Sequence, residues 1–148
     1  MKVISIIQPW ATLIALGEKR FETRSWSTKY RGELAIHASK KIDKDACKHK
    51  RFREALAKHG YDEKTLPTGV ILATCRLVDC HQVIVDFGFS AKLEGGYRAT
   101  DNEYLFGDYS QGRYAWRLRD VNVLTEPIPA KGKLNLWEHP LTEMVGEM

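Results

Sequence analysis

The amino-acid sequence predicts an α+β fold, in which a small, strongly bent β-sheet or β-barrel is flanked by a few helices. Most apolar segments are short, and they are either rich in β-branched residues or alternate with polar ones, as strands do. Only two stretches show helical spacing, and many strands with few helices favour a curved sheet. A chain of 148 residues without repeats or linkers predicts a single domain over residues 1–148.

A strand and a short helix are expected first. The β-branched content of residues 2–7 predicts the strand. Pro9 suits the first turn of a helix, because the N–H that proline lacks would have no partner there. Three apolar residues then fall on one helical face: Trp10, Leu13 and Ile14. Gly17 predicts the end of this helix, since glycine readily adopts the left-handed conformation that follows a last turn.

Two strands and a second helix come next. Residues 20–24 predict a strand, which leads to a turn at residues 30–32. Residues 33–38 alternate in the manner of a strand. The alternation puts one set of side chains on each face: Leu34, Ile36 and Ala38 opposite Glu33, Ala35 and His37. A helix is predicted over residues 43–58, with its first aspartate as the N-cap and Gly60 as its end.

The second half of the chain predicts two long strands around an irregular segment. One strand starts at Val70, after a turn at residues 67–69, and continues past Asp79. The other covers residues 113–125. Between them, residues 86–112 are rich in glycine and aromatic residues, a composition that argues against disorder in a long loop. Three shorter features complete the expectation: a short helix near residues 100–105, a strand at 134–137 that closes the sheet, and a loose tail over residues 141–148.

The balance of charge permits a polyanionic partner. The formal net charge is +4 and the sequence pI is about 9.0. The positive charge is concentrated in one basic segment, residues 40–58. Its basic residues are Lys40, Lys41, Lys44, Lys48, Lys50, Arg51, Arg53 and Lys58. Such a segment is either a solvated helix face or a phosphate contact.

Cysteine content and hydropathy indicate the compartment. Three cysteines without paired spacing predict reduced thiols and a cytoplasmic protein. Cys75, Cys80 and His81 are close in sequence, but no second Cys/His pair at zinc-site spacing completes four ligands, so we expect no metal and no cofactor. No apolar run approaches the length of a membrane span, and the apolar N-terminus is expected to be a strand rather than a signal peptide.

The most informative stretch is residues 17–24, Gly-Glu-Lys-Arg-Phe-Glu-Thr-Arg. On a strand, Glu22 and Arg24 point to one face and Thr23 points to the other. Lys19 lies in the turn before the strand, close enough to join them. A carboxylate between two cations stays ionised and holds both, while the excess positive charge is available to an anion or a polarised carbonyl. If these residues form only a surface ion network, they contribute little to the stability of the fold.

Gly17, Lys19, Glu22 and Arg24 fill the pattern G-x-K-x-x-E-x-R, and with it the chain resembles the ASCH family, a branch of the PUA-like β-barrels. Further runs resemble this family too: residues 8–11, 24–26, 30–32, 35–38, 107–109, 112–116 and 129–132. The resemblance spans roughly residues 3–137. It implies a PUA-like barrel with a cleft between barrel and helix, lined by the motif, that contacts nucleic acid or a nucleobase-like ligand. The activity stays open, because one fold hosts several.

Other residues extend the candidate site. Trp26, among polar neighbours, is a stacking candidate, and stacking on a base contributes about 1–3 kcal/mol. Gln8 either contacts a base edge or caps the helix. His37 is either a satisfied core residue or a ligand contact and proton carrier. Arg31 is a contact or a turn anchor, and Arg113 belongs to a lid or pairs with its neighbour Asp108. The full candidate ligand-binding set is Gln8, Lys19, Glu22, Arg24, Trp26, Arg31, His37, Lys40, Tyr109 and Arg113.

Three functions fit these residues. The first is binding of RNA or single-stranded nucleic acid, or of a modified nucleoside, through cations and stacking. The second is a hydrolase that resembles the amidohydrolases of acetylated cytidine, whose lysine, threonine and glutamate are matched here only by Lys19, because Glu22 stands at the threonine position. The third is a metal-independent ribonuclease in which His37 or Glu22 moves protons. We expect the binding module; if the protein is an enzyme, Lys19 and Glu22 are the catalytic candidates.

Overall fold

Eight strands in one sheet and a few short helices make up the computed structural model, which describes residues 1–141. The strands are β1 (Lys2–Gln8), β2 (Phe21–Arg24), β3 (Gly32–Ile42), β4 (Val70–Asp86), β5 (Ala91–Leu93), β6 (Arg98–Ala99), β7 (Tyr114–Pro129) and β8 (Leu136–Glu138). The helices are α1 (Trp10–Ala15), α2 (Lys44–Lys48), α3 (Lys50–Ala57), α4 (Asp101–Leu105) and the 3₁₀ turn η1 (Glu94–Gly96). The mixed α+β class predicted from the sequence is therefore confirmed.

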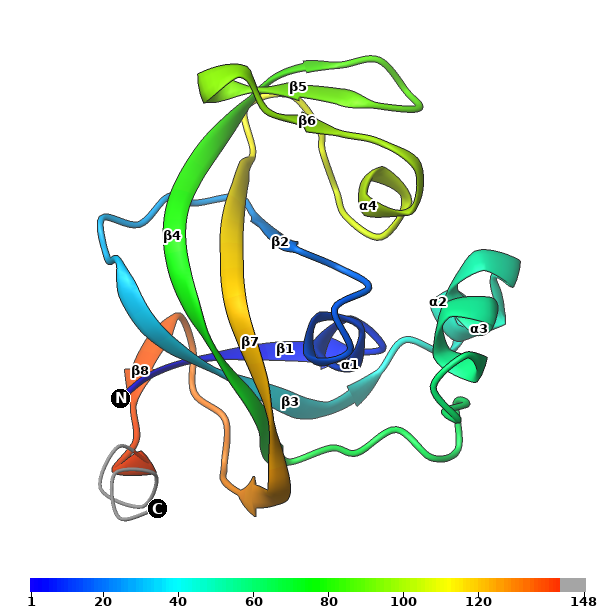
Figure 1. The fold of residues 1–148 in the computed structure, drawn as a ribbon, viewed down its shortest axis with the longest axis vertical. Coiled ribbons are helices and arrows are strands. Elements are labelled where there is room, and N and C mark those ends of the chain that lie inside the picture. The colour runs from blue at the N-terminus through cyan, green and yellow to red at the C-terminus, as the bar shows by residue number, and fades with distance from the viewer. Residues whose placement is uncertain (142–148) are drawn as a thin grey trace.

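The strand order is β2-β7-β4-β3-β1-β8, with β5 and β6 attached to the far end of β4. β1 pairs with β3 in parallel, and the other pairs are antiparallel. β4 and β7 run beside each other along the molecule, and three shifts of register bend this ribbon (Figure 1). Within residues 1–141 the path ends at β2 and β8, which do not pair with each other, so the predicted closed barrel is not found.

The middle of β3, residues 34–38, is buried on both faces of the sheet. Leu34, Ile36 and Ala38 join the main core with residues from β1, α1, β4 and β7. On the other face, Ala35 packs against Val3, Ile71 and other residues of a second cluster that includes Trp137. This second cluster exists because β8 and the segment before it cover that side of the sheet.

The helix predicted over residues 43–58 is two helices. Asp43 caps α2 as expected, because its Oδ1 accepts a hydrogen bond from the Ala46 amide at 3.0 Å. His49 then adopts an extended conformation, with φ −64° and ψ 132°, and this breaks the run. The His49 ring nitrogen Nδ1 accepts the Arg51 amide at 3.2 Å, so the same residue starts α3. Because histidine is an uncommon N-cap residue, the break between the two helices could not be predicted from the sequence.

The irregular segment predicted at residues 86–112 contains short elements. β5, η1, β6 and α4 follow one another there, and α4 lies close to the predicted short helix. Beyond α4, Phe106 is fully buried, and its ring lies 4.5 Å from that of Phe52 on α3. Figure 1 shows this segment at one end of the molecule, with α4 turned back toward α1 and α3. The segment therefore forms a wall beside the helices.

Some remaining expectations concern the cysteines and the C-terminus. Cys47, Cys75 and Cys80 are all free thiols. Leu141 is fully buried in the Trp137 cluster, so this first residue of the predicted tail is packed. The rest of that tail, residues 142–148, lies outside the described part of the chain. In residues 1–141, every helix is too short or too polar to cross a membrane.

Candidate functional site

The site is built on the short connection between α1 and β2. Gly17 has φ +77°, a left-handed conformation that ends the helix as the sequence predicts. The amides of Glu18 and Lys19 then both donate to the carbonyl of Leu13, at 3.0 and 3.2 Å. The chain is thereby turned back along the end of α1, and the side chain of Lys19 enters the interior of the protein.

Lys19, Glu22 and Arg24 form one continuous ion network. Lys19 Nζ lies 3.5 Å from Glu22 Oε1, and its ammonium also donates to the carbonyl of Phe21. Arg24 binds Glu22 Oε2 through two nitrogens, Nε at 3.0 Å and Nη2 at 2.9 Å. Arg24 Nη2 also donates to the carbonyl of Ser5 at 2.9 Å. The convergence of the three side chains that the sequence predicted is found.

Burial increases along this network from Arg24 to Lys19. The side chain of Arg24 is 25% exposed, that of Glu22 is 9% exposed, and that of Lys19 is 1% exposed. Both oxygens of Glu22 are occupied by cations, so this carboxylate has the role of a clamp between them. Two cations and one carboxylate leave one net positive charge in a fixed position, as an anion or a polarised carbonyl requires.

A cleft of about 560 Å³ opens over this network. Its first wall is made by β1 and the residues that follow β2, including Ser25 and Trp26. The ring of Trp26 stands perpendicular to that of Trp116, with ring centroids 4.8 Å apart. Trp116 is fully buried and donates its indole N–H to the carbonyl of Trp26 at 3.3 Å. Trp26 is therefore a half-buried aromatic wall held in place by a core residue.

The opposite wall is the segment after α4. The amide of Asp108 donates to the Thr23 hydroxyl at 3.0 Å, and Arg113 Nε donates to the carbonyl of Asp108 at 3.0 Å. Arg113 also pairs with the carboxylate of Asp108 at 3.5 Å. A side chain at Gly107 would place its Cβ 2.6 Å from Tyr109, so this wall packs closely against its own loop. Of the two predicted roles of Arg113, pairing with Asp108 is found, and the residue also lines the cleft.

Two predicted site residues, Gln8 and Tyr109, are internal. The Gln8 side-chain amide donates to the Thr12 hydroxyl at 2.7 Å and to the carbonyl of Pro67 at 2.8 Å, and its oxygen accepts the Thr12 amide at 2.9 Å. Gln8 thus holds the start of α1, which is the capping role. Tyr109 is 2% exposed and stacks on Tyr104 at 5.7 Å. Burial raises the pKa of Tyr109 well above its ordinary value.

His37 does not line the cleft, and its ring packs against that of Trp137, with ring centroids 5.6 Å apart. Its Nε2 donates to the carbonyl of Ala130 at 2.7 Å, so its Nδ1 accepts the Ser5 hydroxyl at 2.9 Å. Ser5 in turn accepts the indole N–H of Trp137 at 3.1 Å. Burial lowers the pKa of His37, which keeps the ring neutral. Of the two roles predicted for His37, these contacts match the first, a core histidine whose ring nitrogens are both hydrogen-bonded within the protein.

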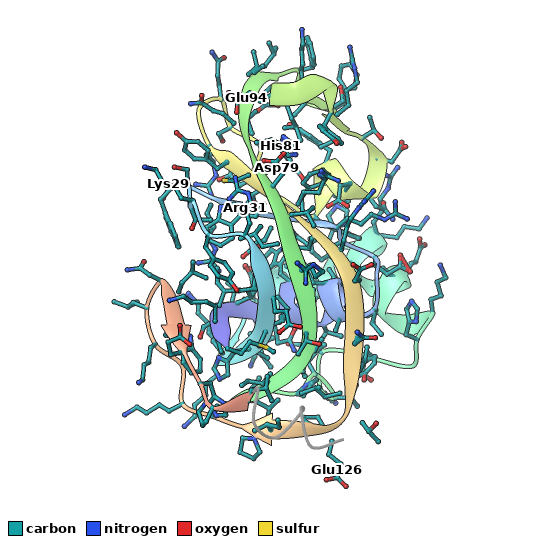
Figure 2. The ribbon with its side chains drawn as sticks, turned by 60° about the vertical axis from the view of Figure 1, so that its left-hand side comes forward. Lys29, Arg31, Asp79, His81, Glu94 and Glu126 are labelled. Atoms are coloured by element: carbon teal, nitrogen blue, oxygen red, sulfur yellow. The ribbon has the colours of Figure 1, made fainter. Side chains whose placement is uncertain are left out.

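Arg31 and Lys40 also lie outside the lining of the cleft. Arg31 donates to the carbonyls of Thr28 and Tyr30, both at 2.8 Å, and pairs with Asp79 at 3.4 Å. Figure 2 shows Asp79 on the upper part of β4 and Arg31 beside it, in the turn that leads into β3. Arg31 is therefore a turn anchor. Lys40 is exposed near the end of β3, and the other basic residues of the basic segment are exposed as well.

Two residues of the site were not expected from the sequence. Thr23 lines the same cleft as Glu22, although strand alternation put it on the other face, because the segment after α4 folds against its hydroxyl. Glu103 accepts the amides of Arg20 at 2.7 Å and Phe21 at 3.3 Å, so it fixes the start of β2. Burial raises the pKa of Glu103, although the charge of Lys19 opposes this. Neither contact follows any spacing rule, because each joins segments about 80 residues apart.

Comparison with known proteins identifies the family of the chain. The model of a family described as the ASCH domain matches residues 4–127. The chain is 36% identical to activating signal cointegrator 1 of Homo sapiens over 138 residues, which cover 91% of this chain and 22% of that protein. The protein of the same name from Mus musculus is 35% identical with the same coverage. The chain thus spans about a fifth of the length of these relatives. Because the family model matches most of the chain, the protein belongs to the ASCH domain family.

Proposed function

We propose that this protein binds RNA or another single-stranded nucleic acid, and that the cleft over Lys19, Glu22 and Arg24 receives one nucleobase-containing unit of the strand. The observation that carries the proposal is the buried ion network, whose net positive charge faces a cleft with an aromatic wall. Single strands are held by cationic grooves and by stacking on aromatic rings, and this cleft offers both.

The size and rigidity of the cleft support a single unit as the ligand. A volume of about 560 Å³ is in the range of small-molecule sites, roughly 300–1,000 Å³. Trp26 and Arg24 are each held by contacts within the protein, so little order has to be gained on binding. A splayed base can stack on Trp26 while its polar edge or its phosphate meets the Arg24 guanidinium.

The same proposal assigns the fold to the PUA-like barrels and the protein to the cytoplasm. Membership of the ASCH family and the strong bend of the β4–β7 ribbon support the barrel assignment. The three free thiols support a reducing compartment. Both assignments are separate from the ligand, and neither is needed for the binding experiment below.

The binding experiment compares two cleft variants with the wild type. Trp26→Ala removes the stacking surface, and a loss of about 1–3 kcal/mol, or roughly 5- to 150-fold in affinity, is expected for a labelled single-stranded RNA. Arg24→Gln removes the more exposed cation of the ion network and is expected to weaken binding as well. Lys133→Gln removes one exposed positive charge outside the cleft and serves as the matched control. Equal affinity of Trp26→Ala, Arg24→Gln and the wild type would contradict the proposal.

A hydrolase is the second candidate, because Thr23 lines the cleft together with Lys19 and Glu22. The present contacts do not favour it: the Thr23 hydroxyl accepts the Asp108 amide, and the Lys19 ammonium is used by Phe21 and Glu22. A ribonuclease that uses His37 is disfavoured by the contacts of His37 with Ser5 and Ala130. Incubation of the wild type with acetylated cytidine and with single-stranded RNA decides the matter. Release of acetate or of cut strands, abolished in Thr23→Val or Lys19→Met, would establish an enzyme.

A further inference from the structure

A second groove, of about 500 Å³, lies on the other side of Lys19 from the cleft. The cleft uses the end of the 17–24 stretch, from Glu22 onward, whereas the second groove uses its beginning, with Arg20 and Phe21. Lys19 lines both. The remaining lining residues come from the end of η1, from β6 and from the middle of β7. We call this feature the arginine groove, because four arginines line it: Arg20, Arg98, Arg117 and Arg119.

The four guanidinium groups are not held in ion pairs, although the charges of Arg20 and Arg117 help to lower the pKa values of Glu103 and Asp79. Within residues 1–141 none of them makes an ion pair, whereas Arg24, Arg31 and Arg113 each pair with an acid. One acidic residue, Asp120, also lines the groove, at a distance too long for an ion pair with any of the four. The result is a concave surface with a net charge of at least +3, and a surface of this kind concentrates anions.

Arg117 is held in a fixed orientation at this groove. Its guanidinium carbon lies 4.7 Å from the ring centroid of Tyr97, and its Nε donates to Nε2 of His81 at 3.3 Å. The rings of His81 and Tyr97 lie 4.5 Å apart, so the three side chains form a stack. Within the described residues the two terminal nitrogens of Arg117 make no hydrogen bond. They form a fork that is preorganised for a bidentate anion such as a phosphate.

His81 can accept the hydrogen bond from Arg117 because its ring is neutral. Its side chain is 5% exposed, and burial lowers the pKa of its ring below the ordinary value, against the opposing effect of Asp79. Asp79 lies 3.9 Å from His81 Nε2 and pairs with Arg31 at 3.4 Å. It makes no ion pair with Arg117, although the charge of Arg117 helps to lower the pKa of Asp79. Figure 2 shows His81 and Asp79 next to each other on β4, with Glu94 above them. Glu94 contributes a backbone hydrogen bond to the same histidine ring.

We propose that the arginine groove binds phosphate groups of the same strand whose nucleobase unit occupies the cleft. This inference rests on the proposed function, since it assigns the neighbouring part of one ligand. Lys19 borders both features, so a strand that leaves the cleft across the start of β2 reaches the groove directly. In this proposal the groove binds the strand through its positive charge and the exposed ring of Tyr97. The cleft binds the nucleobase unit through its fit to the shape of the base.

The test measures the affinity for a short single-stranded RNA at several salt concentrations, from roughly 50 to 200 mM. The double variant Arg98→Gln/Arg119→Gln removes two exposed cations of the groove. The control, Lys131→Gln/Lys133→Gln, removes two exposed cations beyond the end of β7. Each lost phosphate contact lowers the magnitude of the salt slope, d log K/d log[salt], by about 0.7 for a single strand. The groove variant should lose about 1.4 from this slope, and the control should lose nothing.

A nucleoside without phosphate and inorganic phosphate separate the possible ligands. The groove variant should keep wild-type affinity for the nucleoside, because the cleft is intact. An unchanged salt slope in the groove variant, while Arg24→Gln weakens RNA binding, overturns the groove assignment and leaves the proposed function standing. Competition by inorganic phosphate beyond its effect on ionic strength makes the groove a free-anion site and also overturns the assignment. A wild type that binds no RNA overturns both proposals. Thermal melting of each variant verifies that the exposed substitutions leave the fold intact.

Discussion

The cleft and the arginine groove share Lys19, but the cations of the cleft are paired with carboxylates and the arginines of the groove are not. In the cleft, Lys19 and Arg24 are both bound to Glu22, and burial deepens from Arg24 to Lys19. The third cation of the cleft, Arg113, is paired with Asp108. In the groove, four arginines have no acidic partner within the described residues, and one of them is held by a neutral histidine and a tyrosine. Charges that are paired and buried give a fixed geometry, whereas exposed charges that are unpaired give attraction that salt screens. The comparison predicts that the cleft controls stability and that the groove controls salt-dependent binding.

The largest expected effect separates the two features by stability. Glu22→Gln removes the only carboxylate within ion-pair distance of Lys19 in the described residues, and it leaves an ammonium that is 1% exposed without an ion-pair partner. Glu103 is the nearby acid whose charge remains. Removal of one partner of a buried ion pair costs about 3–5 kcal/mol. Chemical denaturation should show a loss of this size for Glu22→Gln. The single variant Arg98→Gln in the groove should have a free energy of unfolding within about 0.5 kcal/mol of that of the wild type, because the Arg98 side chain is exposed.

A second variant tests the cause of that loss. Lys19→Met/Glu22→Leu replaces the pair by apolar side chains of similar length, and a buried ion pair can often be replaced this way without a loss of stability. The double variant should therefore recover most of the stability lost by Glu22→Gln. If Glu22→Gln unfolds at the same denaturant concentration as the wild type, the ion network is not buried in the way described here.

A smaller effect, and one that depends on pH, is expected at the support of the groove. Burial lowers the pKa of His81 in the folded protein below the ordinary histidine value of 6.5. As the pH falls below about 6.5, the unfolded chain takes up a proton that folded His81 resists, so the free energy of unfolding decreases. His81→Gln should flatten this dependence, because a glutamine oxygen can still accept the Arg117 N–H and does not titrate in this range.

Denaturation midpoints measured between about pH 5 and pH 7.5 verify this expectation. Some dependence should remain in His81→Gln, because burial also lowers the pKa of His37. The double variant with His37→Gln should be flatter still. A wild type whose stability is constant over this range would show that neither ring resists protonation in the folded state.

The sequence predicted the local features of the site and missed those that depend on distant segments. The turn at Gly17 and the convergence of Lys19, Glu22 and Arg24 follow from helix-stop and strand-alternation rules within eight residues. Thr23 and Glu103 were not predicted as site residues, because their roles require that the segment after β6 fold back against β2. The arginine groove escaped for the same reason, since its four arginines come from three separate parts of the chain.

Candidate residues with two predicted roles were decided by packing. His37 and Gln8 sit in motif-like runs, yet both are enclosed by hydrogen bonds to core partners. A sequence pattern does not distinguish a polar residue that supports the fold from one that faces a ligand, because both need hydrogen-bonding groups. The break of the long helix at His49 was missed for a related reason: a ring nitrogen took the place of a usual cap.

The smallest expected effect concerns the basic segment, which carries more positive charge than either feature. None of its eight basic residues lines the cleft or the arginine groove, and all are exposed. Exposed charges more than about 8–10 Å from a ligand are screened at physiological salt. The triple variant Lys40→Gln/Lys41→Gln/Lys48→Gln should therefore leave the salt slope of RNA binding close to that of the wild type, with a slight loss of affinity at low salt. If all three residues contact phosphate, the slope should instead fall in magnitude by about 2. That result would assign the phosphate contacts to α2 and the end of β3 instead of the arginine groove. The difference in charge pairing between cleft and groove would then have no consequence for RNA binding.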